Sequence, residues 1–154
     1  MKYIICPPGE YVNIRNGPGK SYGSIAKAHR ADGIQSDYAP GDTQWRGVTM
    51  SNGVQGYVMT DFIVNTKPML VGDMFGTTTL KAKSTGTYVR NLQRCLIYLG
   101  YLGGTIDGIF GTNTENAVKK YQKAKGLTQD GKVGSNTKNA LYNQCYSLFD
   151  KDIS

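Results

Sequence analysis

Residues that could carry out catalysis are scarce in this sequence. Its 154 residues include one histidine, His29, and two glutamates, Glu10 and Glu115. A Ser-His-Asp or Cys-His site would depend on His29, and a zinc site would need three further ligands beside it. Glycoside hydrolysis needs two carboxylates placed on either side of one sugar. The nine aspartates and two glutamates of the chain would supply such a pair only by coincidence. We therefore expect no catalytic residues, no metal site and no cofactor, and an exposed His29.

Two aspartates begin an eight-residue motif that occurs twice. Residues 107–114 read DGIFGTNT and residues 130–137 read DGKVGSNT, 23 residues apart, and both are followed by a related Asn-Ala-apolar stretch. Agreement at so many positions indicates a repeated structural unit. Asp-Gly favours a tight turn in which the glycine adopts left-handed geometry. Calcium would need more oxygen ligands than either loop offers. We interpret Asp107 and Asp130 as turn residues, and Phe110 and Val133 as buried ones.

Each of these turns is expected to start a helix. Thr112 or Ser135 stands at the N-cap position, and Thr112 followed by Glu115 has the pattern of a capping box. Helices are predicted over 114–125 and 137–148. An earlier helix, over 88–99, has an apolar stripe at helical spacing. The second half therefore has the pattern of an all-α three-helix bundle, with residues 78–82 as a short strand against it.

The first half has the pattern of a small all-β barrel. From Tyr11 to Val64, stretches rich in β-branched and aromatic residues alternate with turn clusters about every ten residues. The clusters are residues 16–19, 31–33, 39–42 and 51–53, the last being an Asn-Gly hairpin signal. Along the first strand, Val12 and Ile14 alternate with Asn13 and Arg15, so the polar pair is expected at the solvent side or in a groove.

Three motifs of this half carry a resemblance. They are Val12-Asn13-Ile14-Arg15-Asn16-Gly17-Pro18, Trp45-Arg46-Gly47-Val48 and Gly56-Tyr57-Val58. Over about residues 8–64 the chain resembles the bacterial SH3-type domain family, although that family more often has Trp at the position of Tyr57. The resemblance implies an SH3-like barrel that binds the peptide part of peptidoglycan, either the stem peptide or the cross-bridge.

The second half carries a more specific resemblance. Its motifs appear in order: Val89-Arg90-Asn91-Leu92-Gln93, Leu99-Gly100-Tyr101-Leu102, Asp107-Gly108-Ile109-Phe110-Gly111, Tyr121-Gln122, and Asp130-Gly131-Lys132-Val133-Gly134. Over about residues 78–143 they resemble the family of three-helix peptidoglycan-binding domains, with Tyr121 replacing a frequent Phe. The resemblance implies a non-catalytic module that anchors a protein on peptidoglycan.

Candidate ligand contacts fall in both halves. In the barrel they are Asn13, Arg15, Tyr22, Trp45 and Tyr57, because aromatic faces pack on sugars and peptides and polar groups accept or donate hydrogen bonds. Trp45 is equally consistent with a core residue, and Arg15 with an ion pair to Asp37 or Asp61. In the helical half, the resemblance places a saccharide groove near Tyr101, Leu102, Thr112, Asn113 and Tyr121, each of which could also be a cap or core residue.

The net charge of +7 suits a polyanionic partner. Residues 88–154 carry nine basic and five acidic residues, so most of the positive charge lies in the second half. Its densest run comprises Lys119, Lys120, Lys123 and Lys125. A nucleic-acid interface would need basic side chains poised for bases, whereas this run contains lysines alone opposite the apolar face. We expect a solvated helix face, with attraction to anionic wall polymers as an alternative, and no nucleic-acid partner.

The cysteines and the termini leave alternatives open. Cys6, Cys95 and Cys145 are an odd number, so at least one thiol has no partner in the chain. Cys95 and Cys145 fall on apolar helix faces, either as buried free thiols or as a disulfide, which geometry decides. The first six residues are too short for a secretory signal, and no apolar run is long enough to cross a membrane.

The expected organisation is an SH3-like barrel over 1–66, a linker over 67–77 and a three-helix peptidoglycan-binding domain over 78–154. The expected function is non-catalytic binding of peptidoglycan, outside the cell or at its wall, as the wall-targeting part of a phage or bacterial lysin. The alternative is a docking component of a phage or injection machine that contacts peptidoglycan. A membrane partner is not expected.

Overall fold

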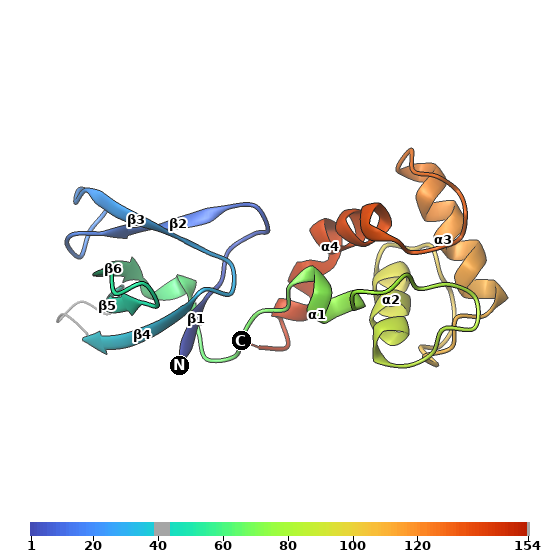
Figure 1. The fold of residues 1–154 in the computed structure, drawn as a ribbon, viewed down its shortest axis with the longest axis horizontal. Coiled ribbons are helices and arrows are strands. Elements are labelled where there is room, and N and C mark those ends of the chain that lie inside the picture. The colour runs from blue at the N-terminus through green and yellow to red at the C-terminus, as the bar shows by residue number, and fades with distance from the viewer. Residues whose placement is uncertain (39–43, 154) are drawn as a thin grey trace. The chain divides into compact units, whose positions relative to one another are not determined.

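The computed structural model describes residues 1–38 and 44–153, and the chain divides into two compact units. The first unit contains residues 1–70 together with the C-terminal residues from Tyr146, and the second contains Val71–Cys145. Figure 1 shows the strands in the first unit and most of the helical residues in the second. The turn expected at 39–42 lies outside the described residues. This division follows the expected change from β to α structure, except that the C-terminal residues belong to the β unit.

Seven strands form one sheet in the first unit. In chain order they are β1 (Lys2–Ile4), β2 (Tyr11–Arg15), β3 (Ser24–His29), β4 (Gly33–Tyr38), β5 (Trp45–Met50), β6 (Gln55–Met59) and β7 (Ile63–Val64), with a 3-10 helix, η1 (Thr60–Phe62), before β7. Their order in the sheet is β3-β2-β6-β5-β4-β1-β7. The predicted hairpin joins β5 to β6, where Gly53 has a φ of 86° and the Val54 N–H donates to Asn52 Oδ1 at 3.1 Å.

The sheet is open, with β3 and β7 at its edges, so the expected SH3-like barrel is not confirmed. The alternation predicted for β2 is present: Val12 and Ile14 are 6% and 0% exposed. They join a core of eight buried residues, the others being Ile4, Cys6, Ala28, Ile34, Val48 and Val58. Alternation identifies a strand and its buried face, whereas closure depends on whether two strands distant in sequence pair, which alternation does not encode.

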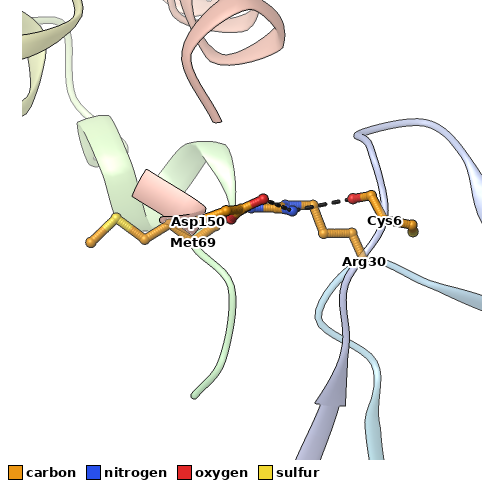
Figure 2. Close-up of polar contacts among 4 residues, drawn as sticks. All are labelled: Cys6, Arg30, Met69 and Asp150. Carbon is orange, nitrogen blue, oxygen red and sulfur yellow. Dashed lines mark hydrogen bonds and ion pairs between the residues drawn. The ribbon is translucent and has the colours of Figure 1, made fainter. Parts of the chain in front are cut away.

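Arg30 ties the C-terminal residues to the sheet unit. Its side chain is 4% exposed and its guanidinium makes an ion pair with both carboxylate oxygens of Asp150. It also donates to the backbone oxygens of Cys6, at 3.1 Å, and Met69, at 3.3 Å, and stacks over the Tyr146 ring at 5.1 Å. Figure 2 shows the guanidinium between the Asp150 carboxylate and the Cys6 carbonyl. A buried charge with this many partners holds the residues from Tyr146 onward within the first unit.

The helical residues form four helices: α1 (Val71–Phe75), α2 (Thr87–Tyr98), α3 (Thr112–Ala124) and α4 (Ser135–Asp150). The three longer ones confirm the three predicted helices, with ends shifted by a few residues. α1 lies inside the stretch expected as a linker, and its Met74 and Phe75 are fully buried. The expected strand near 78–82 is a single antiparallel bridge from Leu80 to Val133.

All three cysteines are free thiols and buried. Cys95 and Cys145 are 0% exposed and their thiols hydrogen-bond each other. That hydrogen bond, together with burial, raises the pKa of Cys95. Of the two alternatives, the structure shows buried thiols in the core of the helical unit.

Candidate functional site

A buried glutamine on α2 holds the first Asp-Gly loop. Gln93 is 2% exposed, and its Oε1 accepts hydrogen bonds from the N–H groups of Asp107 at 3.1 Å and Gly108 at 2.9 Å. Its Nε2 donates to Asp107 Oδ1 at 2.8 Å, Ile109 O at 3.0 Å and Thr114 Oγ1 at 3.2 Å. The Asp107 carboxylate also accepts from the Ile109 N–H. One amide thus fixes the loop and the first turn of α3.

The second loop is held in the same way from α3. Gln122, 1% exposed, accepts from the Gly131 N–H at 3.0 Å and donates to Asp130 Oδ1 at 3.0 Å, Lys132 O at 2.8 Å and Thr137 Oγ1 at 3.2 Å. The turn geometry predicted for both loops is confirmed, because Gly108 and Gly131 have φ angles of 74° and 70°. The glutamine clamps themselves were not predicted. The sequence signal that could have revealed these clamps is a glutamine that directly follows a core residue, once before each loop.

Both aspartates have a pKa below the usual value. For Asp107 the main cause is the hydrogen bond from the Gln93 side chain, followed by the one from the Ile109 N–H. For Asp130 the Lys132 N–H contributes most and the Gln122 side chain next. Donors that point at a carboxylate favour its charged form, so the folded loops hold both groups ionised.

The expected capping box at Thr112 is wrong. α3 begins at Thr112 with Gly111 as N-cap, and no side chain caps the helix. Thr114 is turned inward to Gln93, and Glu115 forms an exposed ion pair with Lys119 at 3.0 Å instead of reaching back to the helix start. Because the clamp orders this turn from inside the unit, Thr112 stays exposed at the surface.

The five candidates of the helical unit separate into surface and core. Thr112 and Asn113 are exposed, whereas Tyr101 and Leu102 are partly buried. Tyr121 is 0% exposed, and its hydroxyl donates to Gln144 Oε1 at 2.7 Å. The Tyr101 ring meets it edge-on at 5.3 Å. Burial raises the pKa of Tyr121. Tyr121 is therefore a core residue, which is one of the two alternatives that the sequence left open for it.

A hollow lies at the second loop, where the sequence had suggested none. It has a volume of about 270 Å³ and is lined by Gln122, Leu127, Thr128, Asp130, Lys132 and residues 134–137. Ser135 and Asn136 occupy the repeat positions of Thr112 and Asn113. Hydroxyl, amide and charged groups converge here on a loop that Gln122 holds rigid, which is an arrangement suited to a polar ligand.

Three of the five candidates in the sheet unit meet in one hollow of about 240 Å³. Asn13, Arg15 and Trp45 line it, together with Tyr11, Val12, Lys20, Val58, Met59 and Phe62. Trp45 is 6% exposed, so it is a buried residue of the sheet unit that also forms part of the wall of this hollow. Arg15 Nη1 donates to the backbone oxygen of Tyr22 at 2.7 Å, and Asn13 Oδ1 accepts from Ser24 Oγ at 2.9 Å. Of the two aspartates considered as partners of Arg15, the side chain of Asp37 lies outside the described residues.

The other two candidates lie elsewhere. Tyr57 lines a second hollow of about 380 Å³ with Asn16, Ile25, Gln55 and residues 47–49 and 56. Tyr22 is 47% exposed, and its ring packs so closely on Gly17 that a Cβ there would lie 2.2 Å from it. Tyr22 therefore packs on a turn that needs glycine.

The described part of the chain has neither a metal-ligand cluster nor a membrane-spanning helix. Residues 1–38 and 44–153 contain no cluster of three His, Cys, Asp or Glu side chains able to hold a metal ion. In the same residues, no helix has the length and apolar character to cross a membrane. The side chain of His29 is 61% exposed, as the sequence predicts, and its Nδ1 lies 3.9 Å from Asp32 Oδ2.

Comparison with known proteins identifies the helical unit. Residues 85–141 match the family described as "Putative peptidoglycan binding domain". No curated protein matches the chain. The match spans both clamped loops and the helices α2 and α3 that carry the two glutamines.

Several solved structures are similar to parts of the chain. The SleB N-terminal domain is 34% identical, with a TM-score of 0.45, over 46% of this chain and 96% of that one. The Burkholderia AP3 phage endolysin is 39% identical, with a TM-score of 0.40, over 42% of this chain and 24% of that one. A peptidoglycan-binding protein from Clostridioides difficile is 23% identical, with a TM-score of 0.42, over 88% of this chain and 72% of that one. The similarity to the peptidoglycan-binding domain family thus covers residues 85–141 of this chain.

Proposed function

We propose that this chain is a non-catalytic cell-wall protein whose two units bind different parts of peptidoglycan. The observation that carries the proposal is the family match over residues 85–141, on a unit whose two loops are each held by a buried glutamine. Rigid loops present polar groups at little entropic cost on binding. The proposed setting is the cell wall or the extracellular space.

The helical unit is proposed to contact the glycan or the glycan–peptide junction. Its second loop offers Lys132, Ser135 and Asn136 around the hollow of about 270 Å³. Its first loop exposes Thr112 and Asn113 at equivalent repeat positions. Sugar hydroxyls both donate and accept hydrogen bonds, and these side chains supply both functions.

The sheet unit is proposed to contact the stem peptide or the cross-bridge. The support is the resemblance of residues 8–64 to bacterial SH3-type domains, together with two hollows. One is lined by Arg15 of β2 and the other by Tyr57 of β6, which pair with each other in the sheet. Two weak sites on one chain gain avidity on a repetitive polymer, because the second contact forms at high effective concentration.

Two settings are compatible with this binding role. In the first, the chain is the wall-targeting part of a phage or bacterial lysin. In the second, it is a docking component of a phage or injection machine. The reading frames next to the gene distinguish them, since a lytic enzyme or a set of structural proteins would be encoded there.

Co-sedimentation of the full chain with insoluble peptidoglycan tests the function, and the repeat supplies matched variants. We expect Asn136→Ala, at the hollow, to weaken binding about two- to tenfold, the value of one lost hydrogen bond. Asn113→Ala, at the equivalent position of the first loop, should weaken it less. The reverse order would place the glycan at the first loop. Failure of the unsubstituted chain to co-sediment would contradict the function itself.

A further inference from the structure

The three hollows differ in charge. The hollow of the helical unit has one acidic and one basic lining residue, Asp130 and Lys132. The described residues that line the hollow around Tyr57 are uncharged. The hollow beside β2 is lined by two basic residues, Arg15 and Lys20, and none of the described residues that line it is acidic. Of these three hollows, it is therefore the one whose lining favours a negatively charged ligand.

The walls of this basic hollow are held in place by the fold. Tyr11, Asn13 and Arg15 alternate along β2 and so project from one side of the strand. The bond from Arg15 Nη1 to the Tyr22 oxygen fixes the guanidinium, and a guanidinium carries five N–H donors. Asn13 Oδ1 is occupied by Ser24, which leaves the Asn13 amide N–H groups as the donors toward a ligand.

The floor is apolar and small. Trp45, which is 6% exposed, lines the same hollow together with the half-buried Met59 and Phe62. Its volume of about 240 Å³ is below the ~300–1,000 Å³ of pockets that enclose drug-sized ligands. Such a space accommodates the last one or two residues of a peptide with small side chains.

We propose that this hollow binds the free C-terminal carboxylate of a peptide. Guanidinium groups recognise carboxylates through paired, charge-assisted hydrogen bonds, and the Lys20 ammonium adds a second positive charge. The small apolar floor receives the terminal side chain. The biological ligand rests on the proposed function: forming a cross-link joins the donor stem by an amide bond and releases its terminal residue, whereas acceptor stems and stems outside any cross-link keep a free C-terminal carboxylate. The sheet unit thereby distinguishes stems with a free C-terminus from donor stems.

Nuclear magnetic resonance of the full chain tests the proposal with two probes that differ in one group. The probes are acetyl-Lys-D-Ala-D-Ala with a free C-terminal carboxylate and the same peptide as its C-terminal amide. We expect the acid to shift the backbone resonances of Asn13, Arg15 and Lys20, and the indole N–H resonance of Trp45, in a saturable manner. The amide should bind about tenfold more weakly, as expected for one charge-assisted contact. Equal binding of acid and amide would overturn the proposal.

Three variants separate ligand contact from folding. Lys20→Gln removes a charge from an exposed residue and should weaken binding of the acid severalfold while leaving the amide unaffected. Arg15→Lys keeps the charge but loses the paired geometry, and should weaken the acid as well. Lys67→Gln, an exposed change outside the hollow, is the matched control. Full affinity in Lys20→Gln and Arg15→Lys would overturn the proposal.

The proposed function is tested separately by co-sedimentation of the unsubstituted chain with peptidoglycan. Co-sedimentation without preference for the acid probe would overturn the carboxylate site alone. Failure to co-sediment would overturn the function, and an acid preference would then still support the site.

Discussion

Removing the Asp150 carboxylate should destabilise the sheet unit more than the loss of an exposed carboxylate would. The Arg30 side chain is 4% exposed and that of Asp150 is 15% exposed. Substituting Asp150 removes the carboxylate that pairs with the buried guanidinium, while the hydrogen bonds to the carbonyl oxygens of Cys6 and Met69 remain. Breaking a buried ion pair by removing one partner costs about 3–5 kcal/mol. We expect Asp150→Ala to lower the free energy of unfolding of this unit by about that amount.

The double variant Arg30→Met, Asp150→Leu distinguishes the pair from the packing around it. Replacing a buried ion pair by apolar residues of similar volume is often neutral. Here Cys6 O and Met69 O would also lose a donor, so we expect a net loss of about 1–3 kcal/mol. That loss is smaller than for Asp150→Ala alone, although two residues are changed.

The assay is urea unfolding followed by tryptophan fluorescence. Trp45 is the single tryptophan of the chain and is 6% exposed in the sheet unit, so its emission reports this unit. Asp61→Ala, which removes an exposed carboxylate from the same unit, is the control and should change stability by less than about 0.5 kcal/mol. A loss below about 1 kcal/mol for Asp150→Ala would refute the reasoning.

Three further predictions concern the helical unit. Gln122→Ala should lower the free energy of unfolding by at least about 2 kcal/mol, because it leaves the loop partners of the buried amide unsatisfied. Urea unfolding followed by circular dichroism measures this loss, and a change below about 0.5 kcal/mol would contradict the clamp. Asp107 and Asp130 have a lowered pKa when folded, so their contribution to stability is present above pH ~4 and is lost as the pH falls through the folded pKa values. The Asp107→Asn, Asp130→Asn double variant should flatten that acid dependence in unfolding curves between pH ~5 and ~2, and an unchanged slope would count against it. Cys95 and Cys145, fully buried, should react with a disulfide reagent far more slowly in native protein than in urea, and equal rates would contradict their burial.

Much of the secondary structure follows from local pattern. Helical spacing of apolar residues predicts α2, α3 and α4, and alternation predicts the buried face of β2. Both depend on residues a few positions apart. α1 escaped prediction because five residues are too few to show a helical period.

The features that escaped prediction depend on contacts between distant residues. Sheet closure requires pairing between strands far apart in sequence, and the sheet is open. The contact between Arg30 and Asp150 joins residues 120 positions apart, so no window of sequence contains it. Thr112 lost its expected capping role because Gln93 orders the helix start from inside the unit.

The candidate site was predicted in part. Asn13, Arg15 and Trp45 do meet in one hollow, because alternation placed the polar pair of β2 outward and the resemblance identified the Trp45 motif. Of the two roles left open for Tyr121, ligand contact or core, the structure shows the core position, and sequence does not separate the two because an aromatic residue beside a loop suits both. The hollow at Asn136 was missed, although the repeat places Asn136 at the position of Asn113.

Co-sedimentation across a salt series tests the central claim most directly. The full chain is incubated with insoluble peptidoglycan, with and without wall teichoic acid, from about 0.1 M to about 1 M salt, where the screening length falls from ~10 Å to ~3 Å. Recognition through the hydroxyl and amide groups at the clamped loops predicts binding to bare peptidoglycan that persists at high salt. Binding only to the teichoic-acid form, lost as salt rises, would contradict the account and assign the interaction to the net charge of +7.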